Sequence, residues 1–157
     1  MVSHLIAYEY DSLSGCVDRQ ASIALSNHLL ATPSFLHPSP SSSKSGNSAT
    51  TSHRNIVELG AGTGLLSLVL GKLLRNSPET TIIATDVDSS VLDQLQANID
   101  LNGLASGVGT SELDWEFSKE EIVAWESASF PDGGRADLIF GADIVRVDSS
   151  PVTSSES

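Results

Sequence analysis

The stretch "NIVELGAGTGLLSLVLGKLL" (residues 55–74) decides which kind of fold this sequence can adopt. Its beginning predicts a short buried strand, and the part after Gly62 is apolar nearly all round, as in a helix packed on a sheet. Between them stand an acid, Glu58, and three glycines at alternate positions, Gly60, Gly62 and Gly64. Because glycine has no side chain to clash, such a turn lets the backbone lie directly against a ligand.

Strands and helices continue to alternate after this stretch. We expect strands at 80–86, 108–113 and 136–143, with helices at 89–103 and 118–128. The alternation predicts an α/β fold: a parallel sheet of about four strands with right-handed crossovers and helices on both faces. The segment "ADLIFGAD" is apolar on both strand faces, which is typical of a central strand.

Polar residues mark the expected helix ends. Ser89 or Ser90 is expected to cap one helix and Gly103 to end it, whereas Ser118 and Glu121 have the spacing of a capping box. The first of these helices has an expected apolar stripe of Val91, Leu92, Leu95, Ile99 and Leu101.

Composition divides the chain into four parts. Residues 1–36 contain a predicted helix, 37–53 form a Ser/Pro-rich linker expected to be disordered, 54–146 form the folded core, and 147–157 form a polar tail expected to be disordered. A few strand-like residues precede the helix: Leu5, Ile6, Tyr8 and Tyr10. The helix itself has an expected apolar face of Ile23, Leu25, Leu29 and Leu30.

Charge and cysteine content narrow the class of protein. Acidic residues outnumber basic ones by 20 to 8, for a formal net charge of −12, which disfavours nucleic acid and is compatible with a basic protein partner. Cys16 is the sole cysteine, the first residues do not resemble a signal peptide, and the longest apolar stretch is too short for a membrane span. We expect a soluble, cytoplasmic monomer. The four histidines form no ligand-spaced cluster, so no metal is expected.

Two familiar glycine-rich motifs do not match. A phosphate-binding P-loop needs Gly-Lys-Ser/Thr, but Lys72 is followed by Leu73. The dinucleotide fingerprint needs a third glycine where Leu65 stands, which disfavours a nicotinamide-dependent oxidoreductase.

The spacing acid-x-Gly-x-Gly-x-Gly resembles the first motif of the Rossmann-like S-adenosylmethionine-dependent methyltransferases. That cofactor has no phosphate and carries an ammonium, a sulfonium and a ribose diol, so acids suit it better than bases. Glu58 can complement the ammonium, directly or through water, while the backbone of the turn, including Ala61, lies against the amino-acid end. Asp86, which stands 24 residues after Gly62, is expected to accept both ribose hydroxyls.

Two later strand ends complete the expected site. Asp114 is expected to accept from the adenine amine, with Leu113 or Trp115 packed on the ring; a core position for Trp115 is the alternative. Ala142 and Asp143 end the last strand, at the edge where open α/β sheets bind their ligands.

Four segments together, "VELGAGTGLLSLVLGKLL", "IIATDVDSSVLDQLQANIDLNG", "ELDW" and "DLIFGADIV", resemble the family 16 protein-lysine methyltransferases, which include enzymes that methylate elongation factor 2. The resemblance implies methylation of a lysine on a translation factor or another basic cytosolic protein. It matches Asp143 to the acid of an Asp-x-x-Tyr segment that shapes the lysine pocket, although Arg146 replaces the tyrosine. In that role Asp143 would accept a hydrogen bond from the lysine amine.

The same resemblance implies a complete sheet of seven strands, so we expect a truncated chain with a weak fold and little activity. The reason is that a central strand would become an exposed edge. Two alternatives remain: a small-molecule methyltransferase on the same fold, and an inactive fragment that retains at most cofactor binding.

Overall fold

The computed structural model describes residues 4–8, 20–32, 36, 53–130 and 134–142. In this part of the chain the elements are β1 (His4–Tyr8), α1 (Gln20–Ala31), β2 (Arg54–Leu59), α2 (Leu65–Leu73), β3 (Thr80–Asp86), α3 (Ser89–Leu101), β4 (Val108–Glu112), α4 (Lys119–Ser129) and β5 (Leu138–Ala142). The predicted strands and helices of the core are confirmed. The predicted linker (apart from residue 53) and the predicted tail lie outside the described residues, as does Cys16.

The strands form one sheet in the order β1-β5-β2-β3-β4, and every neighbouring pair is parallel. Four of these strands were predicted; the fifth, β1, was not. It pairs with β5 along its whole length, from His4 opposite Leu138 to Tyr8 opposite Ala142. The expectation that β5 would be an exposed edge is therefore wrong, because a strand far away in the sequence covers it.

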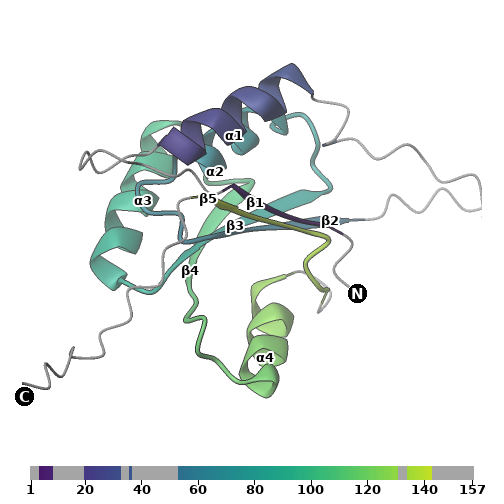
Figure 1. Ribbon diagram of the computed structural model, residues 1–157, viewed down its shortest axis with the longest axis vertical. Coiled ribbons are helices and arrows are strands. Elements are labelled where there is room, and N and C mark those ends of the chain that lie inside the picture. Colours follow the sequence, from purple (N-terminus) through teal and green to yellow (C-terminus); the bar gives the residue numbers. More distant parts are fainter. Residues whose placement is uncertain (1–3, 9–19, 33–35, 37–52, 131–133, 143–157) are drawn as a thin grey trace, which may run out of the picture.

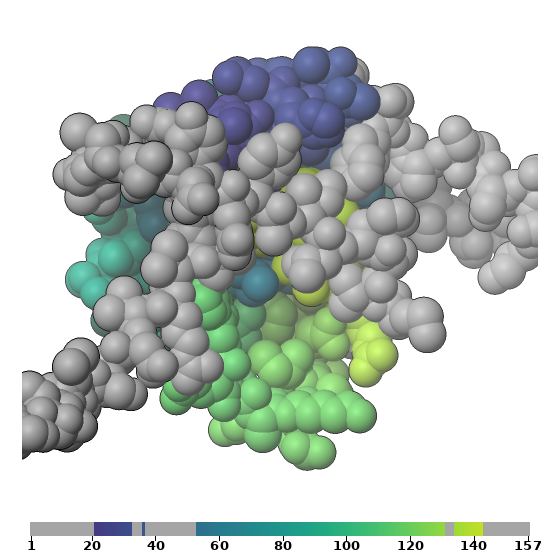
Figure 2. Space-filling model, in the orientation of Figure 1, coloured from purple at the N-terminus to yellow at the C-terminus, as the bar shows by residue number. Residues whose placement is uncertain are grey.

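The connections explain why helices cover both faces. The strands β2, β3 and β4 follow one another across the sheet, whereas β5 lies on the other side of β2. The helices α1, α2 and α3 cover one face of the sheet, and α4 covers the opposite face (Figure 1). The space-filling view likewise places α1 and α4 on opposite sides of β5 (Figure 2). The strands after β2 are added on one side of it and β5 on the other, so the strand order reverses at β2, and the carboxyl ends of β2 and β5 form the topological switch point where α/β sheets bind ligands.

Alternation along the strands separates two apolar clusters. Ile56 points into the main core beneath α1, α2 and α3, whereas its neighbour Val57 points toward α4. The α4 side is thinner: Phe130 and Trp125 meet edge to face at 6.1 Å, and the Trp125 indole donates to Ser111 Oγ over 2.9 Å.

The apolar face predicted for α1 is half right. Leu25 and Leu29 are completely buried against the core, but Ile23 is 50% exposed and Leu30 is 52% exposed. Positions 23 and 30 are seven residues apart, so they share a face of the helix, and that face points outward here. The packing of α1 on α2 joins the N-terminal segment to the main core.

The caps are partly as expected. Ser118 and Glu121 form the predicted capping box, and Gly103, with φ +66°, follows the end of α3. The cap of α3 is Asp88, whose carboxylate accepts from the Ser90 N–H over 2.8 Å, so the expectation of a serine cap is wrong. The expected stripe fails at its end, since Leu101 is 85% exposed.

Candidate functional site

The carboxyl ends of the core strands meet at one edge of the sheet. The end of β2 pairs with β5 at Leu59 and Gly141, and the end of β3 pairs with β4 at Asp86 and Glu112. The glycine turn follows β2 directly, so it lies at the switch point. The structure thus brings the turn, Asp86 and the ends of β4 and β5 to the same edge.

The three glycines of the turn have different reasons to be glycine. All adopt the left-handed conformation, with φ of +59° at Gly60, +55° at Gly62 and +86° at Gly64. A Cβ on Gly64 would lie 2.1 Å from Leu95 Cδ1, whereas a Cβ on Gly62 would meet nothing within 4 Å. Gly64 therefore permits close packing of the turn on α3, and Gly62 leaves bare backbone facing open space.

The turn is attached to β3 by two hydrogen bonds. The Ala61 N–H donates to the Thr85 carbonyl over 2.8 Å, and the Gly62 N–H donates to Asp86 Oδ2 over 3.0 Å. Because both partners lie at the end of β3, these bonds fix the turn beside Asp86.

Asp86 is half-buried and keeps capacity for a ligand. Its Oδ1 accepts from the Val87 N–H over 2.8 Å and from the Asp88 N–H over 3.3 Å, while Oδ2 accepts only the Gly62 N–H among the described residues. An ionised carboxylate offers about four acceptor positions, so Oδ2 can still accept a further hydrogen bond. The predicted bond to a ribose diol fits this geometry and stays a prediction.

Glu58 lies inside the protein, behind the turn. Its side chain is 2% exposed, and Oε2 accepts from both the N–H and the hydroxyl of Ser67 on α2. Burial raises the pKa of Glu58 to about 7; the Ser67 bonds oppose this rise, and the charge of Asp86 adds to it. Its carboxylate is engaged with a helix and not exposed at the edge of the sheet, so any influence on a ligand has to pass through the turn or through water.

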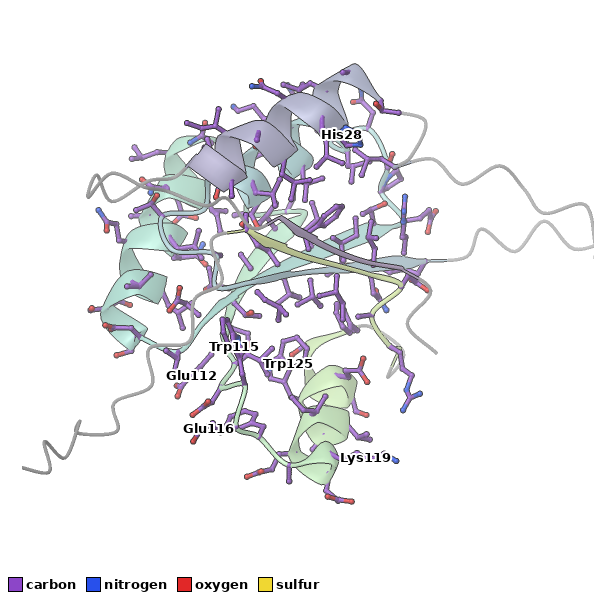
Figure 3. The ribbon with its side chains drawn as sticks, in the orientation of Figure 1. His28, Glu112, Trp115, Glu116, Lys119 and Trp125 are labelled. Carbon is purple, nitrogen blue, oxygen red and sulfur yellow. The ribbon has the colours of Figure 1, made fainter. Side chains whose placement is uncertain are left out.

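Trp115 lies on the surface at the end of β4, with its ring against the turn. It is 46% exposed, and a Cβ on Gly60 would lie 3.5 Å from its Cζ2 atom. Figure 3 shows it close to Glu112 and Glu116. The alternative of a core position is wrong, and the exposed ring face is available for stacking. Asp114 is half-buried and accepts from the Glu116 N–H over 2.9 Å.

The remaining predicted residues contribute backbone at most or cannot be placed. The side chains of Ala61 and Ala142 both lie in the main core, at 9% and 5% exposure. Asp143 lies outside the described residues.

The three described arginines lie away from this edge of the sheet. Arg54 begins β2, and Arg75 and Arg135 precede β3 and β5, so these three arginines lie at the amino end of the sheet. Arg54 donates to the Leu36 carbonyl, and Arg135 lies 3.6 Å from a Glu126 oxygen. The carboxyl edge combines acids, bare glycine backbone and an exposed indole. These groups fit a phosphate-free ligand with a cationic end, a diol and a flat ring.

A pocket of about 300 Å³ opens at the amino end of the sheet, away from the glycine turn. Among its lining residues are Gly71, Arg75 and Gly107. It does not belong to the candidate site. The residues that the structure describes include no trio of His, Cys, Asp or Glu grouped to hold a metal. In the same ranges no helix is both long and apolar enough to cross a membrane.

Four residues of the site were missed by sequence reasoning. Ser67 holds Glu58, Thr85 holds Ala61, and Asn98 on α3 donates to the Thr63 carbonyl of the turn over 3.0 Å. These partners have no sequence signal, because they meet only through packing. The last missed residue, Val87, is 60% exposed beside Asp86, and an apolar residue between two aspartates was a visible signal.

Comparison with known proteins gives a family match and relatives among curated proteins. The model of a family described as lysine methyltransferase matches residues 11–152. Protein-lysine N-methyltransferase EFM3 of Chaetomium thermophilum is 32% identical over 100 residues, which are 62% of this chain and 28% of that protein. Protein-lysine N-methyltransferase EEF2KMT of Mus musculus is 32% identical over 110 residues, which are 63% of this chain and 30% of that protein.

Among solved structures, a protein-L-isoaspartate O-methyltransferase is 16% identical, with a TM-score of 0.41, over 57% of this chain and 24% of that one. The matched part of the chain spans less than a third of the length of the two curated relatives.

Proposed function

This chain belongs to the lysine methyltransferase family, and from that premise we propose that it binds S-adenosylmethionine at the glycine turn and serves methylation of a protein lysine. The observation that supports this most is the bond from the Gly62 N–H to Asp86 Oδ2 at the switch point. It joins a backbone turn open to a ligand with a carboxylate that can accept a diol.

In this proposal each residue at the edge has a separate task. Asp86 binds the ribose hydroxyls, Trp115 stacks on the adenine, and the bare backbone at Gly62 lies against the amino-acid end. The bound cofactor supplies a methyl group already activated by its positive sulfur. The protein therefore has to orient an amine and exclude water, and the reaction needs no metal.

The lysine amine belongs beside Asp143, which directly follows the end of β5 in the sequence. We propose that its carboxylate accepts a hydrogen bond from the amine, which orients the nucleophile and stabilises the charge that develops on it. The Asp143→Asn variant is expected to lose transfer while it still binds the cofactor. Equal transfer by that variant would contradict the role.

Cofactor binding is tested by calorimetric titration with S-adenosylhomocysteine. Asp86→Asn is expected to weaken binding by roughly tenfold or more, because it replaces charge-assisted hydrogen bonds. Asp93→Asn, an exposed aspartate on α3, is the matched control and is expected to bind as the wild type does. Absence of binding by the wild type, or equal binding by Asp86→Asn, would reject the proposal.

The substrate class is tested by incubating the protein with a lysate and methyl-labelled cofactor. We expect label in protein, recovered as methyl-lysine after hydrolysis, on a basic protein such as a translation factor. Label confined to small molecules would favour a small-molecule methyltransferase, and cofactor binding without any transfer would favour a fragment that lacks activity.

The acidic balance of the chain, with a net charge of −12, supports a basic protein partner and disfavours nucleic acid. We also propose a cytosolic, monomeric protein; the single cysteine supports the cytosolic location. Cell fractionation and analytical ultracentrifugation test these two points.

A further inference from the structure

Glu58 stands out among the described acids because it alone is buried, at 2% exposure. Burying a carboxylate is unfavourable unless hydrogen bonds compensate, and Ser67 supplies two of them. An apolar residue in this place would avoid the unfavourable burial altogether. The side chain therefore calls for a role beyond packing.

The start of α2 shows what the carboxylate does. Gly64 occupies the N-cap position, where a side chain would normally accept from the N–H three residues on, and glycine has none to offer. Glu58 reaches across from β2 and accepts that N–H, which belongs to Ser67, over 2.9 Å. A negative charge at this end of a helix is also favoured by the helix dipole. Glu58 and Ser67 thus hold the glycine turn from both of its ends.

We propose that Glu58 is a positioning residue for the cofactor: through Ser67 it fixes the glycine turn between β2 and α2, and it acts on the ligand through that turn, without touching it. This inference rests on the proposed function, because it concerns the same ligand. It differs from the sequence-based expectation that Glu58 complements the ammonium directly.

The charges around Glu58 give the proposal a measurable signature. Its register neighbours are Ala84 on β3 and Phe140 on β5, α2 contributes Ser67, and the charged group that acts on it is Asp86. The pKa of Glu58 is raised to about 7, so its ionisation crosses the neutral range. The ionised form holds α2 more strongly and favours a cationic ligand, so affinity is expected to rise with pH.

The test is a titration of S-adenosylmethionine into the full chain at pH values from about 5.5 to 8.5, around the expected midpoint. We expect affinity to rise roughly tenfold across the range in the wild type, and to be low and independent of pH in Glu58→Gln. In Ser67→Ala the midpoint is expected to move to higher pH, because a bond that favours the ionised carboxylate has been removed.

Three controls separate positioning from general damage. Ser127→Ala, which removes an exposed hydroxyl on α4, should leave the midpoint unchanged, and Ser67→Thr, which keeps the hydroxyl, should restore it. The Ser67 amide resonance of the free protein should follow the same titration. The inference would be overturned if the midpoint of the affinity change stayed the same in Ser67→Ala, or if the affinity of Glu58→Gln still depended on pH.

Failure of the proposed function has a different result. If the wild type binds no cofactor at any pH, the proposed function fails, and the Ser67 amide still tests the contact in the free protein. A Ser67 resonance that stays constant through neutral pH would then overturn the inference by itself.

Discussion

At the scale of single residues, every position of the glycine turn needs glycine for its positive φ, and only one also needs it because a side chain would clash with a neighbour. Gly62 and Gly64 both adopt positive φ, but only Gly64 is closed in by a neighbour, Leu95. The two positions therefore form a matched pair in which backbone strain and steric crowding can be separated.

Gly64→Ala is expected to lower the free energy of unfolding by about 2 to 4 kcal/mol, from strain and overpacking together. Gly62→Ala carries the strain alone and is expected to cost about 1 kcal/mol. Urea unfolding of both variants checks this. Equal losses would show that the contact with Leu95 relaxes at no cost.

The raised pKa of Glu58 predicts that the folded protein loses stability as the pH rises, the opposite of the usual effect of a carboxyl group. The pKa rises from 4.5 to about 7 on folding, so between these values the folded chain retains a proton that the unfolded chain has released. Stability from this group is therefore present at low pH and is lost as pH rises through about 7, by on the order of 3 kcal/mol.

Glu58→Gln removes that loss, so relative to the wild type the variant is expected to gain stability between pH 5 and pH 8, two values roughly at the ends of the window. Urea unfolding at the two values measures it, with Glu120→Gln, an exposed acid on α4, as the control. Relative to the wild type, Glu58→Gln would then gain stability toward pH 8 and yet bind the cofactor more weakly. An acid with a purely structural role would not produce this combination. If the stability of the wild type and that of Glu58→Gln changed equally with pH, the titration of a buried Glu58 carboxyl group would be contradicted.

At the scale of elements, α4 depends on its local sequence more than the other helices do. It has no fully buried residue, and it meets the sheet mainly through Trp125, which is partly buried. Its first turn is closed by the reciprocal bonds of Ser118 and Glu121, at 3.3 and 2.8 Å. With little packing to hold it, this helix should be sensitive to loss of its cap.

Ser118→Ala is expected to cost about 1 kcal/mol and to speed amide hydrogen exchange in the first turn of α4. Ser127→Ala changes the same residue type within the helix, where its hydroxyl donates to the Val123 carbonyl, and should change little. Equal exchange rates in the two variants would argue against the capping box as the source of order.

At the scale of the whole molecule, the sheet depends on a strand from the beginning of the chain. β1 pairs with all five residues of β5, and β5 in turn flanks the switch point beside β2. Without β1, the backbone groups of β5 along that side would be open for pairing with another chain.

Removal of residues 2–8 is expected to lower the free energy of unfolding by roughly 2 to 5 kcal/mol, from the lost strand pairing. It should also cause self-association that increases with concentration, which sedimentation detects. Removal of residues 151–157 is the control of equal length. A shortened chain that melts as the intact one does and stays monomeric would show that β1 contributes little.

The sequence by itself determined what is local: the alternation of strands and helices, the turn of three glycines, the acid at the end of the next strand and the capping box of α4. Each of these follows from periodicity or from residues a few positions apart, and such signals survive without knowledge of the fold. The carboxyl-edge site followed from the same logic, because parallel strands end at one edge.

Only the tertiary structure decided which distant groups meet. It paired β1 with β5, turned Ile23 and Leu30 outward, and buried Glu58 against Ser67. None of these can be read from spacing, because each depends on which faces of separate elements come together. The burial of Glu58 then sets the pKa of its carboxyl group, since desolvation is a property of the packed interior and not of the residue.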